Sequence, residues 1–403
     1  MDAYLLDWLN LLLRWAHVIT GIAWIGASFH FVGLDNSLAR PKDEADRAKG
    51  VGGELWAVHG GGFYHQQKYP VAPAVLPDKL HWSIWESYST WLTGFALFAV
   101  LYLFNASAFL IDKSVFDWSP GAAIATALAF FVVFWLAYDG ICRAFGRSVV
   151  LGKSGDLVVG LLVLVLIVFA SWLACRLFAG RAAFLIVGAI MATAMTANVL
   201  MVIIPGQRKV VAALREGRPV DPVHGQRGKQ RSVHNTYFTL PVVIAMISNH
   251  YGFIFTGPYN WVVLVVLMLA GALVRLSFVL RHRALLEGQP VPWRYAVAGT
   301  LLIAATVAAT LPRPLPPSAA AEPPASFAEV QQVIQQRCAM CHNAVVNSKN
   351  VRLDSPEAIR AHAQPVYQQA VVLKLMPMNN ATAITDAERA TIRRWYEAGA
   401  APR

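Results

Sequence analysis

The sequence predicts an all-α protein: a polytopic membrane bundle of eight transmembrane helices, followed by a small helical domain at the C-terminal end. Three observations lead to this prediction. The 403 residues are 56% hydrophobic, with a mean hydropathy of +0.47, which is too apolar for a soluble chain of this length. The apolar residues form long blocks. A polar segment with helical periodicity follows the last block.

Eight apolar runs are long enough to cross a hydrocarbon core of about 30 Å. These spans are expected near residues 7–33, 84–104, 119–139, 157–177, 183–204, 236–256, 260–280 and 296–311. The 13 Trp residues fit a chain in a lipid bilayer, because indole favours the membrane–water boundary. The N-terminus lacks a basic region and a small-residue cleavage site, so the first span is expected to remain in the protein.

The loops between these runs alternate in basic residues. The first, third, fifth and seventh loops are rich in Lys and Arg, whereas the second, fourth and sixth hold few. The positive-inside rule therefore places the odd loops in the cytoplasm and both termini in the periplasm of a bacterial inner membrane. This orientation accounts for the formal charge of +11. No basic run is interleaved with aromatic residues, so nucleic acid is not an expected partner.

The predicted domain organisation has three parts. Residues 1–311 form the transmembrane domain. Residues 312–325 are rich in Pro and Ala and are expected to be a semi-rigid linker. Residues 326–403 are expected to fold as a compact domain, which is close to the lower size limit for independent folding. Two capping boxes of the form Ser/Thr-x-x-Glu predict helix starts near its two ends.

The C-terminal domain carries a haem-attachment motif. Cys338, Cys341 and His342 have the spacing C-x-x-C-H, which suits two thioether bonds to a haem and an axial histidine ligand to its iron. A zinc half-site is the alternative, but no second Cys or His pair with zinc spacing follows. We therefore expect a covalent haem c, and since bacterial haem c is attached in the periplasm, we expect the domain there.

The sixth iron ligand should be a methionine from a loop before the last helix. Met376 and Met378 both lie in that segment. An N-terminal helix, C-x-x-C-H, a loop and an aromatic C-terminal helix resemble class I cytochrome c, and in short bacterial members the ligand is typically the Met directly before a Pro. That resemblance favours Met376. Ordinary packing is the alternative role for Met378.

Histidines inside the apolar spans suggest a second cofactor. His17 lies in the outer part of the first span, and His250 reaches a similar depth near the outer end of the sixth. Arg14 shares a helical face with His17 and suits a haem propionate or another anion. These residues are candidates for a haem b site. Alternatively, both histidines simply hydrogen-bond to neighbouring helices.

A polar layer is expected near the cytoplasmic ends of the spans. Its residues could together hold a small polar anion, although each has a structural alternative, such as membership of an aromatic belt. The candidates are His59, Lys68, Trp82, Glu86 and Tyr88 around the first loop and second span, with Asn198, His234 and Asn235 on the fifth and sixth. A substrate oxidised there would need an intermediate centre, because its electrons must cross about 30 Å to reach the outer haem. The alternative is that the substrate binds in the outer half of the bundle.

The whole chain resembles one known family. The segments "RWAHVITGIAWIGASFHFVGLDNSL", "HGGGFYHQQKY", "HWSIWESYSTWLTG", "RCAMCH" and "LMPMNNATAITDAER" are similar to those of the bacterial membrane-bound urate hydroxylases. The resemblance implies eight membrane helices fused to a cytochrome c. It also implies oxidation of urate to 5-hydroxyisourate in purine catabolism. Electrons would leave through haem c toward a cytochrome oxidase or a soluble cytochrome, without formation of hydrogen peroxide.

Several residues suit this chemistry. Lys68 could offset the charge of the urate anion, and Trp82 or Tyr88 could stack on its ring. Glu86 or His59 is eligible as the base that activates water. The other polar candidates, assigned to substrate binding, are Asn198, His234 and Asn235.

Two other functions compete with this interpretation. In the first, the bundle is a noncatalytic electron conduit that passes electrons from quinol or a partner protein to the haem. In the second, the bundle is a transporter with the cytochrome as a sensor, although no broken-helix pair or repeated half is evident.

Overall fold

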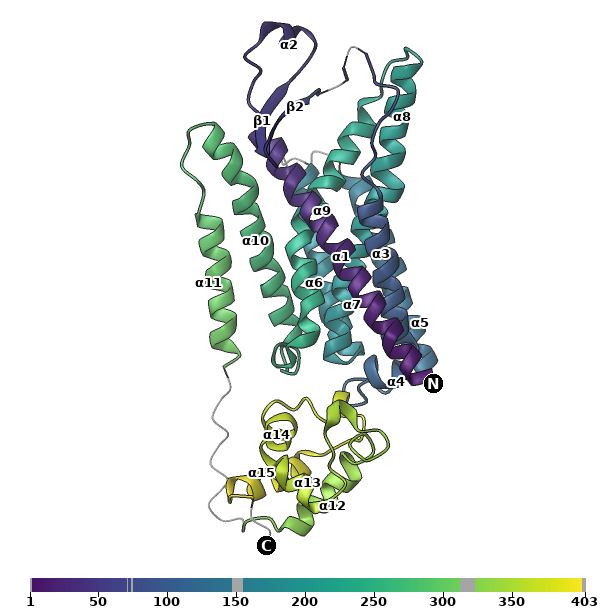
Figure 1. Cartoon of the computed structure of the whole chain (residues 1–403), viewed down its shortest axis with the longest axis vertical. Coiled ribbons are helices and arrows are strands. Elements are labelled where there is room, and N and C mark those ends of the chain that lie inside the picture. The colour runs from purple at the N-terminus through teal and green to yellow at the C-terminus, as the bar shows by residue number, and fades with distance from the viewer. Residues whose placement is uncertain (1, 71, 74, 147–154, 312–322, 401–403) are drawn as a thin grey trace.

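A computed structural model describes the chain except residues 1, 71, 74, 147–154, 312–322 and 401–403. The described residues are mostly helical, and they form a long bundle with a smaller domain beyond one of its ends (Figure 1). Most of the expected linker, 312–325, lies outside the described residues.

The bundle contains a helical segment at each of the eight expected positions. These segments are α1 (Asp2–Ser37), α3 with a π-helical extension (Trp85–Phe98, Ala99–Leu103), α5 (Pro120–Phe145), α6 (Gly155–Leu177), α7 with its continuation through α8 (Gly180–Ala197, Asn198–Ile203, Ile204–Arg215), α9 (Pro222–Ile247), α10 (Asn260–Leu286) and α11 (Arg294–Ala309). Among the described residues, five are long and apolar enough to cross a membrane: Tyr4–Ser37, Pro120–Phe145, Gly155–Leu177, Gly180–Arg215 and Asn260–Leu286. This composition is consistent with membrane association. The full set of eight spans stays a prediction.

Local sequence explains where these helices begin and how closely they pack. Ser119 caps α5 by accepting a hydrogen bond from the Ala122 amide, and Pro120 occupies the first turn, where its missing N–H costs nothing. Helices α9 and α10 approach closely at Gly271, where an added Cβ would lie 3.2 Å from the Leu240 Cβ. Helix α7 lies at the centre of the bundle and buries Phe184, among other residues, completely.

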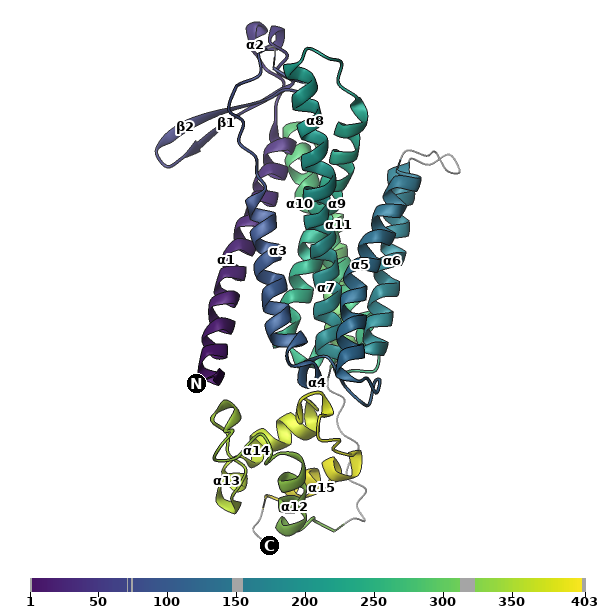
Figure 2. The same cartoon turned by 90° about the vertical axis from the view of Figure 1, so that its right-hand side faces the viewer.

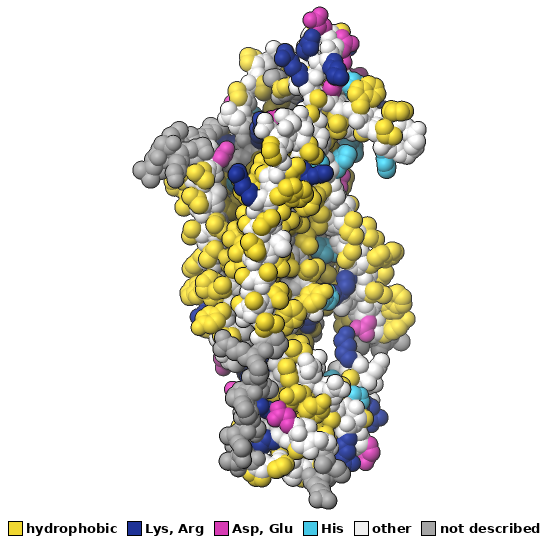
Figure 3. All heavy atoms as spheres, turned by 90° about the vertical axis from the view of Figure 1, so that its left-hand side faces the viewer, with side chains coloured by type: hydrophobic (Ala, Val, Ile, Leu, Met, Phe, Trp, Pro, Cys, Tyr) yellow, Lys and Arg dark blue, Asp and Glu magenta, His cyan; other side chains and the backbone are white. Residues whose placement is uncertain are grey.

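The surface and the two ends of the bundle differ in character. Hydrophobic side chains cover the middle of the bundle, and charged side chains gather at its upper end and on the C-terminal domain (Figure 3). Helix α1 begins, and α11 ends, at the end of the bundle that faces the C-terminal domain (Figure 1). If both termini lie on the periplasmic side, α1 must begin and α11 must end at the same end of the bundle, as they do. Which side of the membrane that end faces stays a prediction.

The all-α expectation is wrong for one segment of the first loop. Residues Gly53–His59 (β1) and Gly62–Lys68 (β2) form an antiparallel hairpin that extends sideways from the bundle (Figure 2). Gly60 and Gly61 both have positive φ, +60° and +81°, as a two-residue hairpin turn requires. Residues that favour strands flank these glycines: Trp56 and Val58 on β1, and Phe63 and Tyr64 on β2.

The C-terminal domain has its own hydrophobic core, in which Ile334, Ile392 and Trp395 are almost completely buried. Its elements are α12 (Phe327–Arg337), α13 (Pro356–Ala361), α14 (Ala363–Val366) with a π-helical turn (Tyr367–Val372), and α15 (Asp386–Glu397). Both predicted capping boxes are confirmed, at the starts of α12 and α15.

The α15 capping box supports a stability prediction. Thr385→Ala should destabilise the domain by about 1 kcal/mol, because the Glu388 amide loses the hydroxyl that it donates to. Thermal unfolding of the full chain, followed through the absorbance of the C-terminal domain, measures the change. Thr391→Ala on the same helix is the matched control and should be neutral or slightly stabilising, since Ala favours a helix interior. Equal losses in both variants would contradict the capping role.

Candidate functional site

One cavity of about 1270 Å³ extends from the bundle into the C-terminal domain. It is lined on the bundle side by Arg14, His17, Tyr102, Arg181, Asn249 and His250, and on the domain side by Cys338, Cys341, His342, Met376 and Met378. The predicted haem c residues and the predicted haem b residues therefore share one space.

The two parts of the chain touch directly at the rim of this cavity. The Asn379 side chain donates to the carbonyl of Ala108 at 2.6 Å. Leu375 packs onto Gly252, where an added Cβ would overlap it. The absence of a side chain at Gly252 thus allows the C-terminal domain to lie close against the bundle.

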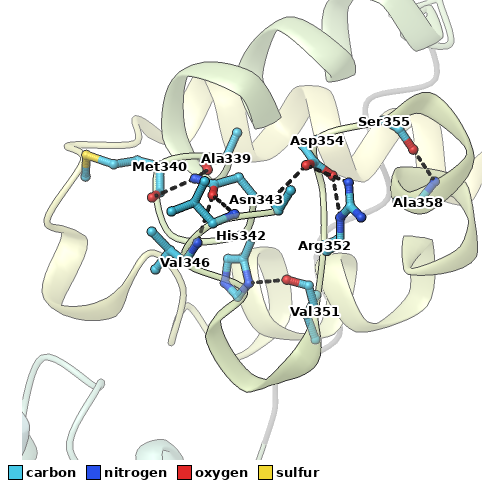
Figure 4. A network of polar contacts seen from close by, with 12 residues as sticks. Ala339, Met340, His342, Asn343, Val346, Val351, Arg352, Asp354, Ser355 and Ala358 are labelled. Carbon is cyan, nitrogen blue, oxygen red and sulfur yellow. Dashed lines mark hydrogen bonds and ion pairs between the residues drawn. The ribbon is translucent and has the colours of Figure 1, made fainter. Parts of the chain in front are cut away.

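The C-x-x-C-H loop is arranged for metal ligation by its histidine. The Nδ1 of His342 lies 3.0 Å from the carbonyl oxygen of Val351 (Figure 4). Because a carbonyl only accepts, Nδ1 carries the proton, and the Nε2 lone pair is left for a metal. Metal-ligating histidines typically donate their other ring N–H in this way. Burial raises the pKa of the Cys338 thiol to about 11.

Polar contacts fix the loop that follows the motif. The Asn343 side-chain oxygen accepts from the amides of Val345 and Val346, and Asp354 accepts from the Ala344 amide while it pairs with Arg352 (Figure 4). These contacts form a folded turn around His342.

Both candidate methionines line the cavity, and their environments differ. The carbonyl of Met376 accepts a hydrogen bond from Arg389 at 2.9 Å, which fixes the backbone there. The sulfur of Met378 lies 3.9 Å from Arg181 of the bundle. Two thiols, a histidine and a thioether on one cavity fit a covalent haem c. In the described part of the chain, no group of three His, Cys, Asp or Glu residues could hold a bare metal ion.

His17 is held with one face of its ring against α3. Its Nδ1 lies 3.1 Å from the Thr90 carbonyl and 3.3 Å from the Thr93 hydroxyl. Gly94 permits this contact, because a Cβ there would lie 2.7 Å from the His17 Cε1. Because the Thr90 carbonyl only accepts, Nδ1 carries the proton and donates to it, and the Nε2 lone pair is left for a metal in the cavity. This geometry fits the predicted haem b ligand.

The other predicted haem b residues also line the cavity. Arg14 is exposed and hydrogen-bonds to Asn10 at 3.3 Å, and His250 is exposed in a short 3₁₀ turn, Ser248–His250. Trp24, Trp91 and Phe95 are among the aromatic residues that line the same cavity.

Three of the eight predicted inner-layer residues lie together. Asn198 is completely buried, and its amide nitrogen donates to the Asn235 side-chain oxygen at 2.9 Å and to the Tyr138 hydroxyl at 2.9 Å. The Tyr138 hydroxyl also lies 2.8 Å from Nδ1 of His234. Arg231 donates to the Asn198 oxygen at 3.3 Å. The substrate role of these residues stays a prediction, and the hydrogen bonds show that they also hold helices together.

Sequence reasoning missed the residues that complete this network. Arg231 is 3% exposed and pairs with Asp139 at 2.6 Å. Tyr138 is completely buried between them and His234. One signal was available for Asp139, since an acid at the end of an apolar span needs a partner or a function. Arg231 lies one helical turn before Asn235 in α9, whereas the sequence predicts that the sixth span begins only near residue 236.

The other five inner-layer candidates are dispersed. Lys68 forms a 2.7 Å ion pair with Asp35, and His59 is exposed beside the hairpin turn. Glu86 lies in the first turn of α3 and is half-buried, with Trp82 just before that helix and Tyr88 within it. None of the eight inner-layer candidates lines the cavity described above.

The fold and the cavity define the class: a mostly helical protein whose described residues include five apolar helices long enough to cross a membrane, and whose C-terminal domain carries a C-x-x-C-H motif. The chain belongs to the urate oxidase N-terminal family, whose family model matches residues 3–310. This relationship supports an oxidoreductase that acts on urate. No curated protein and no solved structure matched the chain.

Proposed function

We propose that this protein is a membrane-bound urate hydroxylase that converts urate to 5-hydroxyisourate and delivers the electrons to a covalent haem c. One observation carries the proposal: a single cavity in a chain of the urate oxidase N-terminal family reaches Cys338, Cys341 and His342. A haem bound there supplies a one-electron acceptor. The bundle would cross the inner membrane eight times, with both termini and the cytochrome domain in the periplasm.

The overall reaction defines what the protein must handle. The urate monoanion and one water give 5-hydroxyisourate, one proton and two electrons. The water oxygen forms a new bond to ring carbon 5, and no oxygen molecule is reduced at the site. Electrons therefore leave one at a time toward a soluble cytochrome or a cytochrome oxidase, and hydrogen peroxide is not a product.

A second cofactor would assist this transfer. His17 would ligate a haem b, with Arg14 and His250 beside it, in the bundle part of the same cavity. A haem b and a haem c in the same cavity could each accept one of the two electrons that urate releases. Water activation is assigned to Glu86 or His59, with Lys68 near the anion, as predicted from the sequence. Glu86 lies one helical turn from Thr90, which lines the cavity, whereas His59 and Lys68 lie on the hairpin of the first loop. None of the three lines the cavity itself.

Product stoichiometry tests the proposed function. Purified full-length protein, supplied with urate and oxidised soluble cytochrome c, should reduce two cytochromes for each urate consumed and form no hydrogen peroxide. Peroxide formed in proportion to urate would contradict the reaction. The competing conduit function predicts rapid cytochrome reduction with a quinol and none with urate.

A further inference from the structure

We propose that the urate anion binds in the outer part of the cavity, against Arg181 and Tyr102, directly beside the C-terminal domain. This inference rests on the proposed function and gives the substrate a location different from the inner polar layer. It follows from the Arg181 guanidinium, which has no carboxylate partner among the described residues, from the hydrogen-bonded pair of Tyr102 and Asn249, and from the position of these groups beside the C-terminal domain.

Arg181 has a positive charge without a counter-ion. It lies in the first turn of α7 and is half-buried at the cavity wall. Within the described part of the chain, no carboxylate lies within ion-pair distance of its guanidinium, and its Nε is buried without a hydrogen-bond partner. Its guanidinium contacts only uncharged groups among the described residues, the Met378 sulfur at 3.9 Å, which is a weak acceptor, and the Tyr102 hydroxyl. Burying a guanidinium nitrogen unpaired is costly, so an anionic ligand is the natural partner.

Tyr102 and Asn249 provide polar groups next to this charge. Tyr102 is 2% exposed, and its hydroxyl donates to the Asn249 side-chain oxygen at 2.9 Å. Asn249 therefore has its amide nitrogen left to donate to a ligand. Arg14 and Arg181 both line the cavity together with Tyr102. The two guanidinium groups thus create a positive region in this part of the cavity.

Urate matches this set of groups chemically. It is a planar anion whose edges alternate carbonyl oxygens and ring nitrogens. The rigid fork of a guanidinium can make two parallel hydrogen bonds to such an edge. The Asn249 amide can donate to a further oxygen, and Phe109, which lies 5.8 Å below the Arg181 guanidinium, offers an aromatic face. The cavity exceeds the usual upper size of about 1,000 Å³ for one small ligand, so it has room for urate beside a haem.

The position of Arg181 also suits electron transfer. Met378, which touches Arg181, lies two residues from Met376, the favoured haem c ligand. Urate held at Arg181 would therefore lie next to the proposed electron acceptor. Its electrons would not need to cross the hydrocarbon core, and urate would reach the site from the side of the C-terminal domain.

A haem propionate carries the same carboxylate-type chemistry, so the experiment must distinguish it from urate. Arg181→Gln removes the charge, and the matched control is Lys113→Gln, another cation on the cavity wall that already pairs with Asp117 at 3.5 Å. For each full-length variant, the KM for urate is measured by cytochrome c reduction, and the b and c haem contents by pyridine haemochrome spectra.

We expect Arg181→Gln to raise the KM for urate by about 10- to 100-fold with unchanged haem content, since charge-assisted hydrogen bonds are lost. Lys113→Gln should leave the KM within about twofold of the original value, as expected for an exposed ion pair. If Arg181→Gln loses haem, Arg181→Lys distinguishes a urate site from a propionate site. Lys keeps the positive charge but lacks the planar fork of donors that makes two parallel hydrogen bonds. A raised KM with full haem supports the urate site, and an unchanged KM overturns it.

Failure of the site is distinguishable from failure of the function. If the unmodified protein oxidises urate and Arg181→Gln does so with the same KM, the proposed site alone is wrong. If the unmodified protein does not oxidise urate at all, the proposed function is wrong, and the site with it.

Discussion

Replacing both Cys338 and Cys341 with Ser should abolish urate-dependent electron transfer. The two thiols are the only groups of the C-x-x-C-H motif that can form thioether bonds, and His342 alone would hold a haem weakly. The described C-terminal domain places both thiols on the wall of the shared cavity. Without a covalently bound haem, this domain would have no group that accepts electrons from urate.

This result is measured in two ways. Haem staining on a denaturing gel should disappear, and cytochrome c reduction by urate should fall to the uncatalysed rate. Cys175→Ala is the matched control, because Cys175 is a buried free thiol of the bundle, far along the chain from the motif. It should keep both signals. Full urate-dependent reduction by the double Ser variant would contradict the assigned role of the motif.

Adding a single methyl group at Gly94 should remove haem b while leaving haem c. The Cβ of Gly94→Ala would lie 2.7 Å from the His17 Cε1, so the ring must leave its hydrogen bond to the Thr90 carbonyl. Changes that disturb the orientation of a metal ligand typically weaken metal binding by about 10- to 100-fold. We expect the b haem to be lost on purification and urate-dependent reduction of haem c to slow by a similar factor.

Gly160→Ala is the matched control for this experiment. Gly160 is also a glycine within a bundle helix, but an added Cβ there meets nothing within 4 Å. This variant should keep equal amounts of b and c haem in pyridine haemochrome spectra. If Gly94→Ala also keeps its b haem, or if the unmodified protein contains haem c alone, His17 does not ligate a second haem.

The sequence alone predicted the features that depend on local pattern. Hydropathy located the helical segments of the bundle, and the Ser/Thr-x-x-Glu patterns located the starts of α12 and α15, because capping involves residues only three apart. The apolar faces of α12 and α15 also indicated that the C-terminal domain has a hydrophobic core of its own, as the structure shows. These predictions needed no information about long-range contacts.

Long-range contacts account for what was missed. Trp56 and His65 stack across two strands at 4.2 Å, and the glycines between the strands drew attention to a turn rather than to this pairing. Arg231 and Asp139 are 92 residues apart and become an ion pair only when α5 and α9 pack together.

The shared cavity is the clearest case of a feature hidden from the sequence. It exists because Leu375 packs onto Gly252 and Asn379 bonds to the Ala108 carbonyl, which brings the C-terminal domain against the bundle. Arg181 gave little sequence signal, since a lone basic residue in a short loop is usually solvated. Its significance depends on the buried nitrogen and on the Met378 contact.

Anaerobic mixing of urate with the oxidised full-length protein tests the central claim most directly. The α band of the covalent haem c should appear in the absorption spectrum without any quinol or other reductant, and its amplitude should saturate with urate concentration. If the band stays absent with urate and appears only with quinol, the protein is an electron conduit, and its assignment as a urate hydroxylase is wrong.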